Sequence, residues 1–267
     1  AIKQSCDIYF YEMARKLGVD KLAVIAKKYG LGSKILGDVY FDEKRGLVPD
    51  TKWKRNNLGK GWLLGETIIN GIGQGYIQTT PLQLCLMTAQ LANGGYKIKP
   101  HIISDDSVSF EEIKSRIQND MNNYDLSLNQ NLDQQNVKSS IRLYKNSKNI
   151  KYVLEAMFGS TNEPGGTSYR SRYDNKKYQF AGKTGTSQVR RITKRERDLD
   201  LKQSQIEYKN RDHALYIAFA PYKEPRYSIS VLIEHGGSGS KVAAPLASKL
   251  IKKIIDRHKI RVQTRKA

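Results

Sequence analysis

Apolar residues recur at helical spacing through the first 29 residues of the chain. In "SCDIYFYEMARKLGVDKLAVIAKKY" (residues 5–29) they lie three or four positions apart on both sides of Gly18. Gly18 interrupts this pattern, and "GLG" at 30–32 ends it, so the pattern predicts two consecutive helices. The Gly-, Lys- and Trp-bearing stretch that follows, up to about residue 80, is interpreted as a loop.

The middle of the chain contains two further predicted helices and one polar stretch. "TTPLQLCLMTAQLANGG" predicts a helix with Thr80 as N-cap, Pro81 at the first helical position and Gly94-Gly95 as its end. Residues 104–140 are rich in Asn, Gln, Ser and Asp with little periodicity, which favours a solvated insertion. "NIKYVLEAMFG" predicts a short helix that leads into a Gly/Pro turn, "STNEPGGTSYRS".

The final third of the chain changes from helical spacing to strand-like runs. These are "YQFAGKTGTSQV", "HALYIAFAPY" and "RYSISVLIEHG", joined by a charged loop at 190–212 and by the turn "YKEPR". Short connections between neighbouring strands favour antiparallel pairing. After "GGSGS", the run "KVAAPLASKLIKKIIDRH" predicts an amphipathic helix that packs on the sheet. Helices, then strands, then a covering helix indicate an α+β fold.

The length and hydropathy allow one large domain or two small ones. The chain has 267 residues, of which 39% are hydrophobic, and no run approaches the 18 uninterrupted apolar residues of a membrane span. No signal-peptide pattern opens the sequence. Because "AIKQSCDIYFYEMARKLG" begins without Met and runs directly into a helix, we expect a fragment or processed chain whose beginning lies elsewhere.

The net charge is +20, and such a balance favours anionic partners. The positive charge is nevertheless spread along a Lys-, Asn- and Ile-rich chain, which favours compositional bias as its origin. No nucleic-acid-reading motif is present, and we expect no nucleic-acid partner. Cys6 and Cys85 show neither metal-ligand spacing nor a disulfide framework, and we expect no metal.

"KTGTSQV" (residues 183–189) places a lysine, two threonines and a glycine within one strand. Gly185 allows a ligand to approach the backbone closely, and Thr184 and Thr186 project to one face because strand residues two apart share a side. Lys183 then points to the opposite face, so a twist or the strand edge must bring it to the same site. The alternatives are an edge strand protected by its lysine and a strand laid against an anionic ligand.

Ser5 and Asp7 lie two positions apart, just before the first predicted helix. Both residue types are favoured at helix N-caps, so an N-capping pair is one interpretation. The order of this pair and the later "KTGT" stretch supports a second interpretation, which depends on a family resemblance.

Five separated stretches of the chain together resemble the transpeptidase domain of class B penicillin-binding proteins, most of all the branch that serves cell elongation. They occur in the family's order and cover most of the chain except 104–140: "SCD" before a helix, "GIGQGYIQTTPLQL", "NEPGGTSY", "AGKTGTSQV", and "DHALYIAFAP" followed by "HGGSGSKVAAPLA". The resemblance implies the penicillin-binding transpeptidase (β-lactamase-like) fold, here the C-terminal part of a single domain. Residues 1–103 and 141–175 would be mainly helical, 104–140 an insertion, and 176–258 the antiparallel strands and closing helix.

The family carries three catalytic signatures, of which this chain matches two. Ser5-Cys6-Asp7 matches the Ser-x-Asn/Asp signature, and Lys183-Thr184-Gly185 matches Lys-Thr-Gly. The Ser-x-x-Lys that holds the family's nucleophile precedes the second signature by several dozen residues, so we expect it upstream of this chain and expect the chain alone to be inactive. One literal Ser-x-x-Lys, at 238–241, follows both other motifs and is interpreted as a strand-to-helix turn.

The resemblance also implies a function and a role for each matched residue. The family transfers the acyl group of D-alanyl-D-alanine stem peptides to cross-link peptidoglycan during elongation, and β-lactams acylate the same serine. Ser5 would relay a proton to the leaving group, Asp7 would order the cleft edge, and Lys183 would supply positive potential. Thr184 and Thr186 would bind the substrate carboxylate beside Gly185, with the Thr186 N–H as an oxyanion donor.

Partners and location follow from the same resemblance. We expect peptidoglycan stem peptides, β-lactams and other cell-wall elongation proteins as partners, no cofactor, and a place on the periplasmic face of the bacterial inner membrane with the anchor upstream. Two alternatives stay open: a catalytically silent binding or scaffold fragment of a split gene, and a serine D,D-carboxypeptidase or β-lactamase relative. The family sheet has five strands, two of which would pair beside residues 227–234.

Overall fold

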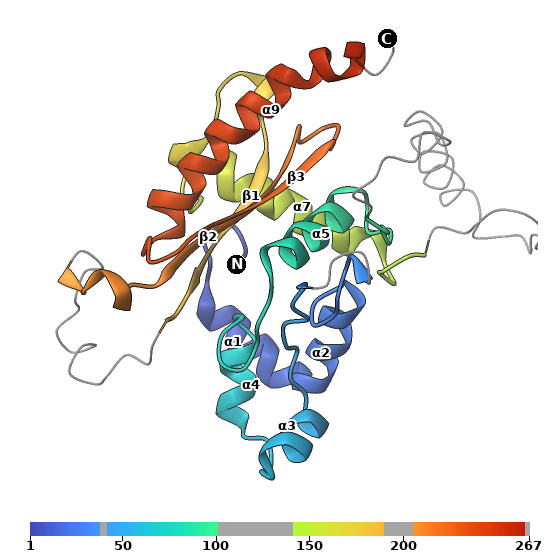
Figure 1. The fold of residues 1–267 in the computed structure, drawn as a ribbon, viewed down its shortest axis with the longest axis vertical. Helices are drawn as coiled ribbons and strands as arrows, with labels where there is room; N and C mark the ends of the chain where they lie inside the picture. Colours follow the sequence, from blue (N-terminus) through green and yellow to red (C-terminus); the bar gives the residue numbers. More distant parts are fainter. Residues whose placement is uncertain (38–41, 101–140, 190–204, 265–267) are drawn as a thin grey trace, which may run out of the picture.

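The structure is a computed structural model that describes residues 1–37, 42–100, 141–189 and 205–264 (Figure 1). The predicted insertion at 104–140 lies outside the described residues, as does most of the charged loop at 190–212. Within the described part, a helical region lies on one side and a three-stranded sheet with a long closing helix on the other. No helix in these ranges is long and apolar enough to cross a bilayer.

The two N-terminal helices form where the apolar spacing predicts them. They are α1 (Asp7–Leu17) and α2 (Val19–Lys28). Gly18 separates them with a φ of 79°, a left-handed conformation that glycine adopts without steric penalty. The prediction of two consecutive helices is confirmed.

The loop expected before residue 80 is wrong, because this stretch contains two short helices, α3 (Thr51–Leu58) and α4 (Leu64–Asn70). Asp50 caps α3 through its side chain. Lys54, whose side chain is only 4% exposed, pairs with Glu66 at 2.5 Å and so joins the two helices. Caps and an ion pair stabilise these short helices, so they show no apolar periodicity that a sequence pattern could detect.

The next two helices lie close to their predicted positions. In α5 (Pro81–Ala92), the Thr80 side chain accepts from the Gln83 N–H while the Gln83 side chain accepts from the Thr80 N–H, which confirms Thr80 as N-cap. α7 (Ser147–Asn162) is longer than predicted, since residues 160–162 belong to the helix and not to the turn. Short 3₁₀ turns occupy Tyr169–Ser171, Lys176–Tyr178 and Tyr208–Asn210.

The described sheet is antiparallel with strand order β1-β2-β3. β1 (Ala181–Ser187) pairs with β2 (His213–Ala220), with Lys183 opposite Ile217, and β2 pairs with β3 (Tyr227–Ile233). β1 and β3 are therefore the two outer strands of the described sheet. This agrees with the predicted antiparallel strands.

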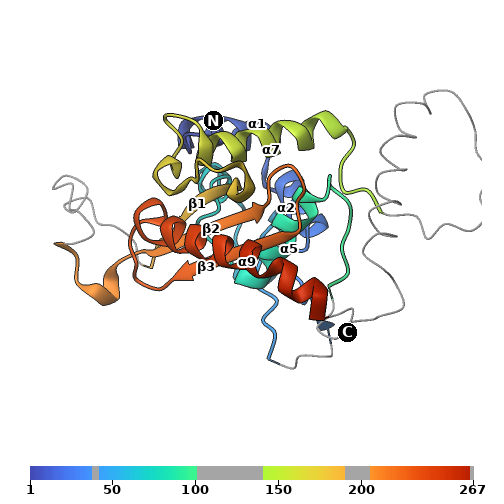
Figure 2. The same ribbon diagram turned by 90° about the horizontal axis from the view of Figure 1, so that it is seen from above.

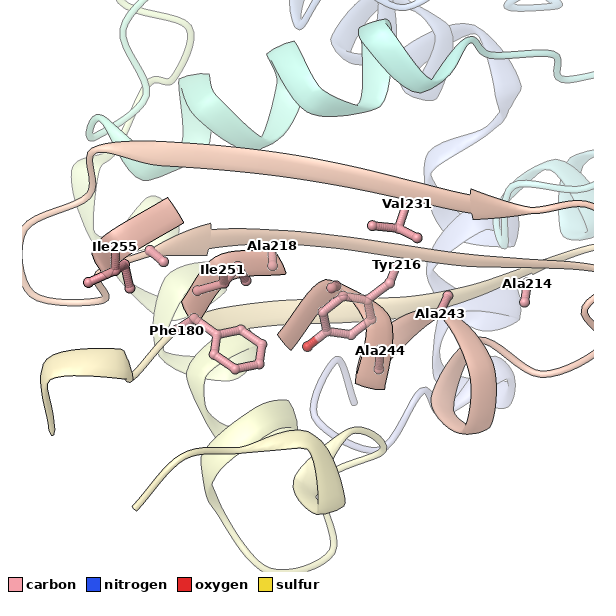
Figure 3. Close-up of a cluster of buried hydrophobic side chains, with 11 residues drawn as sticks. Phe180, Ala214, Tyr216, Ala218, Val231, Ala243, Ala244, Ile251 and Ile255 are labelled. Carbon is pink, nitrogen blue, oxygen red and sulfur yellow. The ribbon is translucent and has the colours of Figure 1, made fainter. Parts of the chain in front are cut away.

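The main core lies between the sheet and α9 (Ala244–Thr264), which is entered through a π-helical turn, Gly239–Ala243. Figure 2 shows α9 lying along one face of the sheet, while α5 and α7 lie toward the other. Figure 3 shows the side chains of this core, which include Phe180, Tyr216, Ala218, Ala244 and Ile251. Alanines on both elements let α9 approach the strands closely, as the amphipathic pattern predicts. The α+β fold is confirmed.

Candidate active site

Lys183 and Ser5, 178 positions apart in sequence, are brought into direct contact: the Lys183 Nζ donates a hydrogen bond to the Ser5 Oγ. The same Nζ donates to the Thr184 carbonyl oxygen at 2.8 Å. Ser5 lies in a tight turn before α1, with a φ of 50° and its N–H bonded to the Ile2 carbonyl at 3.2 Å. The two matched motifs therefore form one polar centre.

The N-capping interpretation of Ser5 is wrong. The N-cap of α1 is Cys6, which makes no side-chain capping bond, and the Ser5 hydroxyl is engaged with Lys183 instead. Asp7 is the first residue of α1, where a negative charge is favourable at the helix N-terminus, and its side chain is exposed. Ser5 is thus held in an uncommon left-handed conformation that offers α1 no cap.

β1 presents the candidate residues because it is an outer strand of the described sheet. Ala181 packs against Met157 of α7, and strand alternation puts Lys183 on that same side, where the N-terminal segment runs. Thr186 is exposed and Thr184 is half-buried. The expectation that a twist or the strand edge brings the lysine to the site of the two threonines stays a prediction.

The electrostatics of Lys183 are set by burial and by one nearby carboxylate. Burial lowers the pKa of the Lys183 ammonium below its ordinary value, and the negative charge of Asp7 partly opposes this shift. Asp7 therefore favours the charged form of Lys183 without a direct ion pair being needed.

A chain of hydroxyl groups supports Thr184 and was not found from sequence. The Thr184 Oγ1 lies 3.1 Å from the Thr167 Oγ1, which in turn lies 3.0 Å from the Oγ of buried Ser160. Thr167 belongs to "NEPGGTSY", a stretch that contributed to the family resemblance but had no assigned role. Short hydroxyl side chains separated by 7 and 17 positions give no periodic signal that would join them.

A second hydroxyl cluster lies behind β1. The Tyr216 hydroxyl lies 3.0 Å from both the Thr161 Oγ1 and the Ser168 Oγ. Burial raises the pKa of Tyr216 to about 12, so it remains a donor. Its hydroxyl occupies the space that a side chain at Gly182 would need, which explains the glycine directly before Lys183.

The downstream Ser-x-x-Lys, residues 238–241, forms the predicted turn. Ser238 is the N-cap of the π-helical turn, and its Oγ lies 3.1 Å from the Ser240 Oγ and accepts from the Lys241 N–H at 3.4 Å. The Ser238 hydroxyl therefore caps the start of this turn.

Within the described residues, neither a metal-ligand cluster nor the apolar hollow beside α2 involves this centre. Among the residues that the structure describes, no three His, Cys, Asp or Glu side chains lie close enough to hold a metal ion. A hollow of about 460 Å³ lies between α2 and α5 and is lined mainly by apolar side chains, without Ser5 or Lys183. The chemistry-bearing groups converge instead at β1.

A lysine on an outer strand that contacts a serine hydroxyl, over a sheet closed by a C-terminal helix, is the arrangement that the resemblance to penicillin-binding transpeptidases implies. The penicillin binding protein transpeptidase domain family matches residues 1–252, and the chain belongs to this family.

The curated relatives include the peptidoglycan D,D-transpeptidases MrdA of Salmonella typhimurium and Acinetobacter baumannii. The first is 32% identical over 265 residues, which is 96% of this chain and 37% of that protein. The second is 33% identical over 251 residues, covering 92% of this chain and 33% of that protein.

Solved structures of penicillin-binding protein 2 (PBP2) share the fold. Pseudomonas aeruginosa PBP2 in complex with WCK 5153 has a TM-score of 0.71 and 34% identity, over 97% of this chain and 49% of that one. Helicobacter pylori PBP2 in complex with MreC has a TM-score of 0.74 and 28% identity, over 97% and 40%. The predicted family and fold are confirmed, and the chain spans 37% of the length of the Salmonella relative.

Proposed function

We propose that the Ser5 turn and strand β1 form two walls of the acylation site of a peptidoglycan D,D-transpeptidase. This enzyme cross-links the cell wall during elongation. The observation that carries this proposal is the hydrogen bond from Lys183 to Ser5, which joins two family motifs 178 positions apart in sequence. The relatives named peptidoglycan D,D-transpeptidase support the reaction type.

The β1 wall binds the terminal carboxylate of the stem peptide. Lys183 supplies positive potential, the hydroxyls of Thr184 and Thr186 donate hydrogen bonds, and Gly185 lets the ligand backbone approach the strand. The negative charge of Asp7 favours the charged form of Lys183, which burial disfavours. This arrangement suits an acceptor-only ligand group such as a carboxylate.

The chemistry is acyl transfer in two steps. A serine hydroxyl attacks the carbonyl between the two D-alanines, the C–N bond breaks, and the proton lost by the serine reaches the departing amine through Ser5. The Thr186 N–H stabilises the oxyanion that forms on the attacked carbonyl. An amine of a neighbouring stem then attacks the ester and regenerates the serine. β-Lactams enter the first step and stay attached.

The nucleophile in this proposal is a serine outside residues 1–267, within a longer protein. Ser238, in the one Ser-x-x-Lys of this chain, has its hydroxyl engaged in capping, which favours a structural role. In this account residues 1–103 and 141–175 are the helical region of one transpeptidase domain, 104–140 is an insertion, and 176–258 supplies the last strands and closing helix.

Location and partners follow from the relatives. H. pylori PBP2 was solved in complex with MreC, so we extend to this protein an association with other elongation proteins. The proposed site faces the periplasm, and a membrane anchor outside residues 1–267 holds the protein at the inner membrane.

Labelling of the complete protein with a fluorescent penicillin, followed by denaturing electrophoresis, tests the proposal. We expect a covalent band that Lys183→Met weakens strongly and that the matched control Lys241→Met leaves unchanged. No band with the complete protein would favour a silent scaffold instead. Release of D-alanine from a stem pentapeptide without an added amine acceptor would favour a carboxypeptidase or β-lactamase relative.

A further inference from the structure

Thr167 touches both walls of the proposed site, although no family signature includes it. Its N–H donates to the Lys3 carbonyl at 3.3 Å, two residues before Ser5, and its Oγ1 lies 3.1 Å from the Thr184 Oγ1 on β1. A second tie runs beside it, since Lys3 Nζ and a carboxylate oxygen of Glu163 are 2.6 Å apart. The segment 163–167 therefore connects the Ser5 turn to the strand.

The placement of Thr167 depends on the two glycines before it. A Cβ on Gly166 would collide with the backbone carbonyl oxygens of Gly159 and Ser160 at the end of α7. Gly165 has a φ of 79°, which a side chain disfavours. Glycine at both positions therefore allows this turn, and Gly166 lets the segment lie directly on α7.

The hydroxyl chain from Ser160 through Thr167 to Thr184 has two possible hydrogen-bond directions. A hydroxyl carries one proton and accepts through its lone pairs, whereas a carboxylate only accepts. A carboxylate bound to Thr184 must therefore receive the Thr184 proton. The chain then runs in one direction: Ser160 donates to Thr167, and Thr167 donates to Thr184.

We propose that Thr167 is a positioning residue that orients the Thr184 hydroxyl as a donor to the carboxylate of the substrate or β-lactam. This inference rests on the proposed function and deepens it, because it names the residue that controls how the site recognises a carboxylate. Ser160 is fully buried, and the only side-chain hydrogen bond of its hydroxyl is to Thr167, so its proton has one destination within the described structure. Donor chains of this kind strengthen each member through polarisation.

The test compares benzylpenicillin with its methyl ester on the complete protein, because the ester lacks the carboxylate charge. Thr167→Val keeps the β-branched shape and removes the hydroxyl. It is expected to weaken the apparent affinity for benzylpenicillin about fivefold, the scale of one lost hydrogen bond between neutral hydroxyls, and to leave the ester nearly unaffected. The acylation rate constant at saturation should change by no more than about twofold.

Two further variants separate orientation from general stability. Thr167→Ser retains the hydroxyl and should restore the preference for the free acid. Thr161→Val removes a buried hydroxyl from the neighbouring Tyr216 cluster, so it should lower the melting temperature while keeping the parent preference. Ser160→Ala removes only the far end of the chain and should reduce the preference about threefold, which supplies a second reading if Thr167→Val does not fold.

Each result has a definite meaning. A parent protein that forms no adduct with benzylpenicillin refutes the proposed function, and this inference with it. A parent that forms the adduct, together with Thr167→Val and Ser160→Ala variants that keep the full preference for the free acid, refutes the role of Thr167 alone. A Thr167→Ser variant as impaired as Thr167→Val would also contradict it.

Discussion

Replacement of Ser5 by glycine separates a catalytic role of its hydroxyl from any structural role. Ser5 has a φ of 50°, in the left-handed region that residues with a Cβ disfavour by about 1–2 kcal/mol. Glycine removes this strain together with the hydroxyl that Lys183 contacts. If Ser5 is retained for catalysis at the expense of stability, the variant loses activity without losing stability.

The expected magnitudes follow from the contacts. Relief of the left-handed strain is opposed by about 0.5–1 kcal/mol from the greater freedom of glycine in the unfolded chain, so the free energy of unfolding should rise by up to about 1.5 kcal/mol. Loss of one donor at a reacting centre raises the barrier by about 2–4 kcal/mol, which slows acylation about 30- to 900-fold. Lys183→Met, which keeps the chain length and removes the charge, should fall in the same range.

The assay is the second-order rate of acylation by benzylpenicillin, measured for the complete protein, the two single variants and the double variant. Because Ser5 and Lys183 act as one unit, the double variant should be no slower than about the slower single variant. Thermal unfolding of the same four proteins gives the stability comparison. Multiplicative rate losses, or a Ser5→Gly variant that is less stable but acylates normally, would refute the shared site.

Asp7→Asn should move the alkaline limb of the pH–rate profile for benzylpenicillin acylation to lower pH. Affinity for the carboxylate is lost as pH rises through the Lys183 pKa, and that pKa falls further without the Asp7 charge. An alkaline limb that does not move would contradict this. Gly182→Ala should lower the free energy of unfolding by about 2–4 kcal/mol in a denaturant titration, because its Cβ would displace the Tyr216 hydroxyl from its partners. Thr80→Ala should remove about 1 kcal/mol of stability and leave acylation of the folded protein unchanged, and a rate change there would show that the cap matters to the site.

The sequence predicted best those elements that are stabilised by residues close to one another in the chain. α5 has its N-cap, its proline and its capping box within four consecutive residues, so Thr80 could be identified from sequence. The strands and α9 follow the alternation and amphipathic spacing that a buried face requires. The sequence pattern did not predict α3 and α4, because the Lys54–Glu66 ion pair that joins them connects residues twelve positions apart in polar segments.

The site was predicted in part for a different reason. Resemblance to a family indicated that Ser5 and Lys183 belong together, but composition and periodicity could not distinguish Ser5 as a cap from Ser5 as a partner of Lys183. That distinction depends on the left-handed turn at Ser5, which a sequence pattern does not reveal. The contact between Thr167 and Thr184 was not predicted, because it depends on how residues 163–167 lie on α7. The proposed catalytic and carboxylate-binding roles of these residues remain predictions.

A crystal structure of the complete protein acylated by benzylpenicillin tests the central claim most directly. The account predicts the ligand carboxylate within about 3.2 Å of the hydroxyls of Thr184 and Thr186, with Ser5 still bonded to Lys183 beside the ligand. It also predicts the acyl group on a serine outside residues 1–267. A carboxylate bound away from β1, or an acyl group on Ser238, would contradict the account.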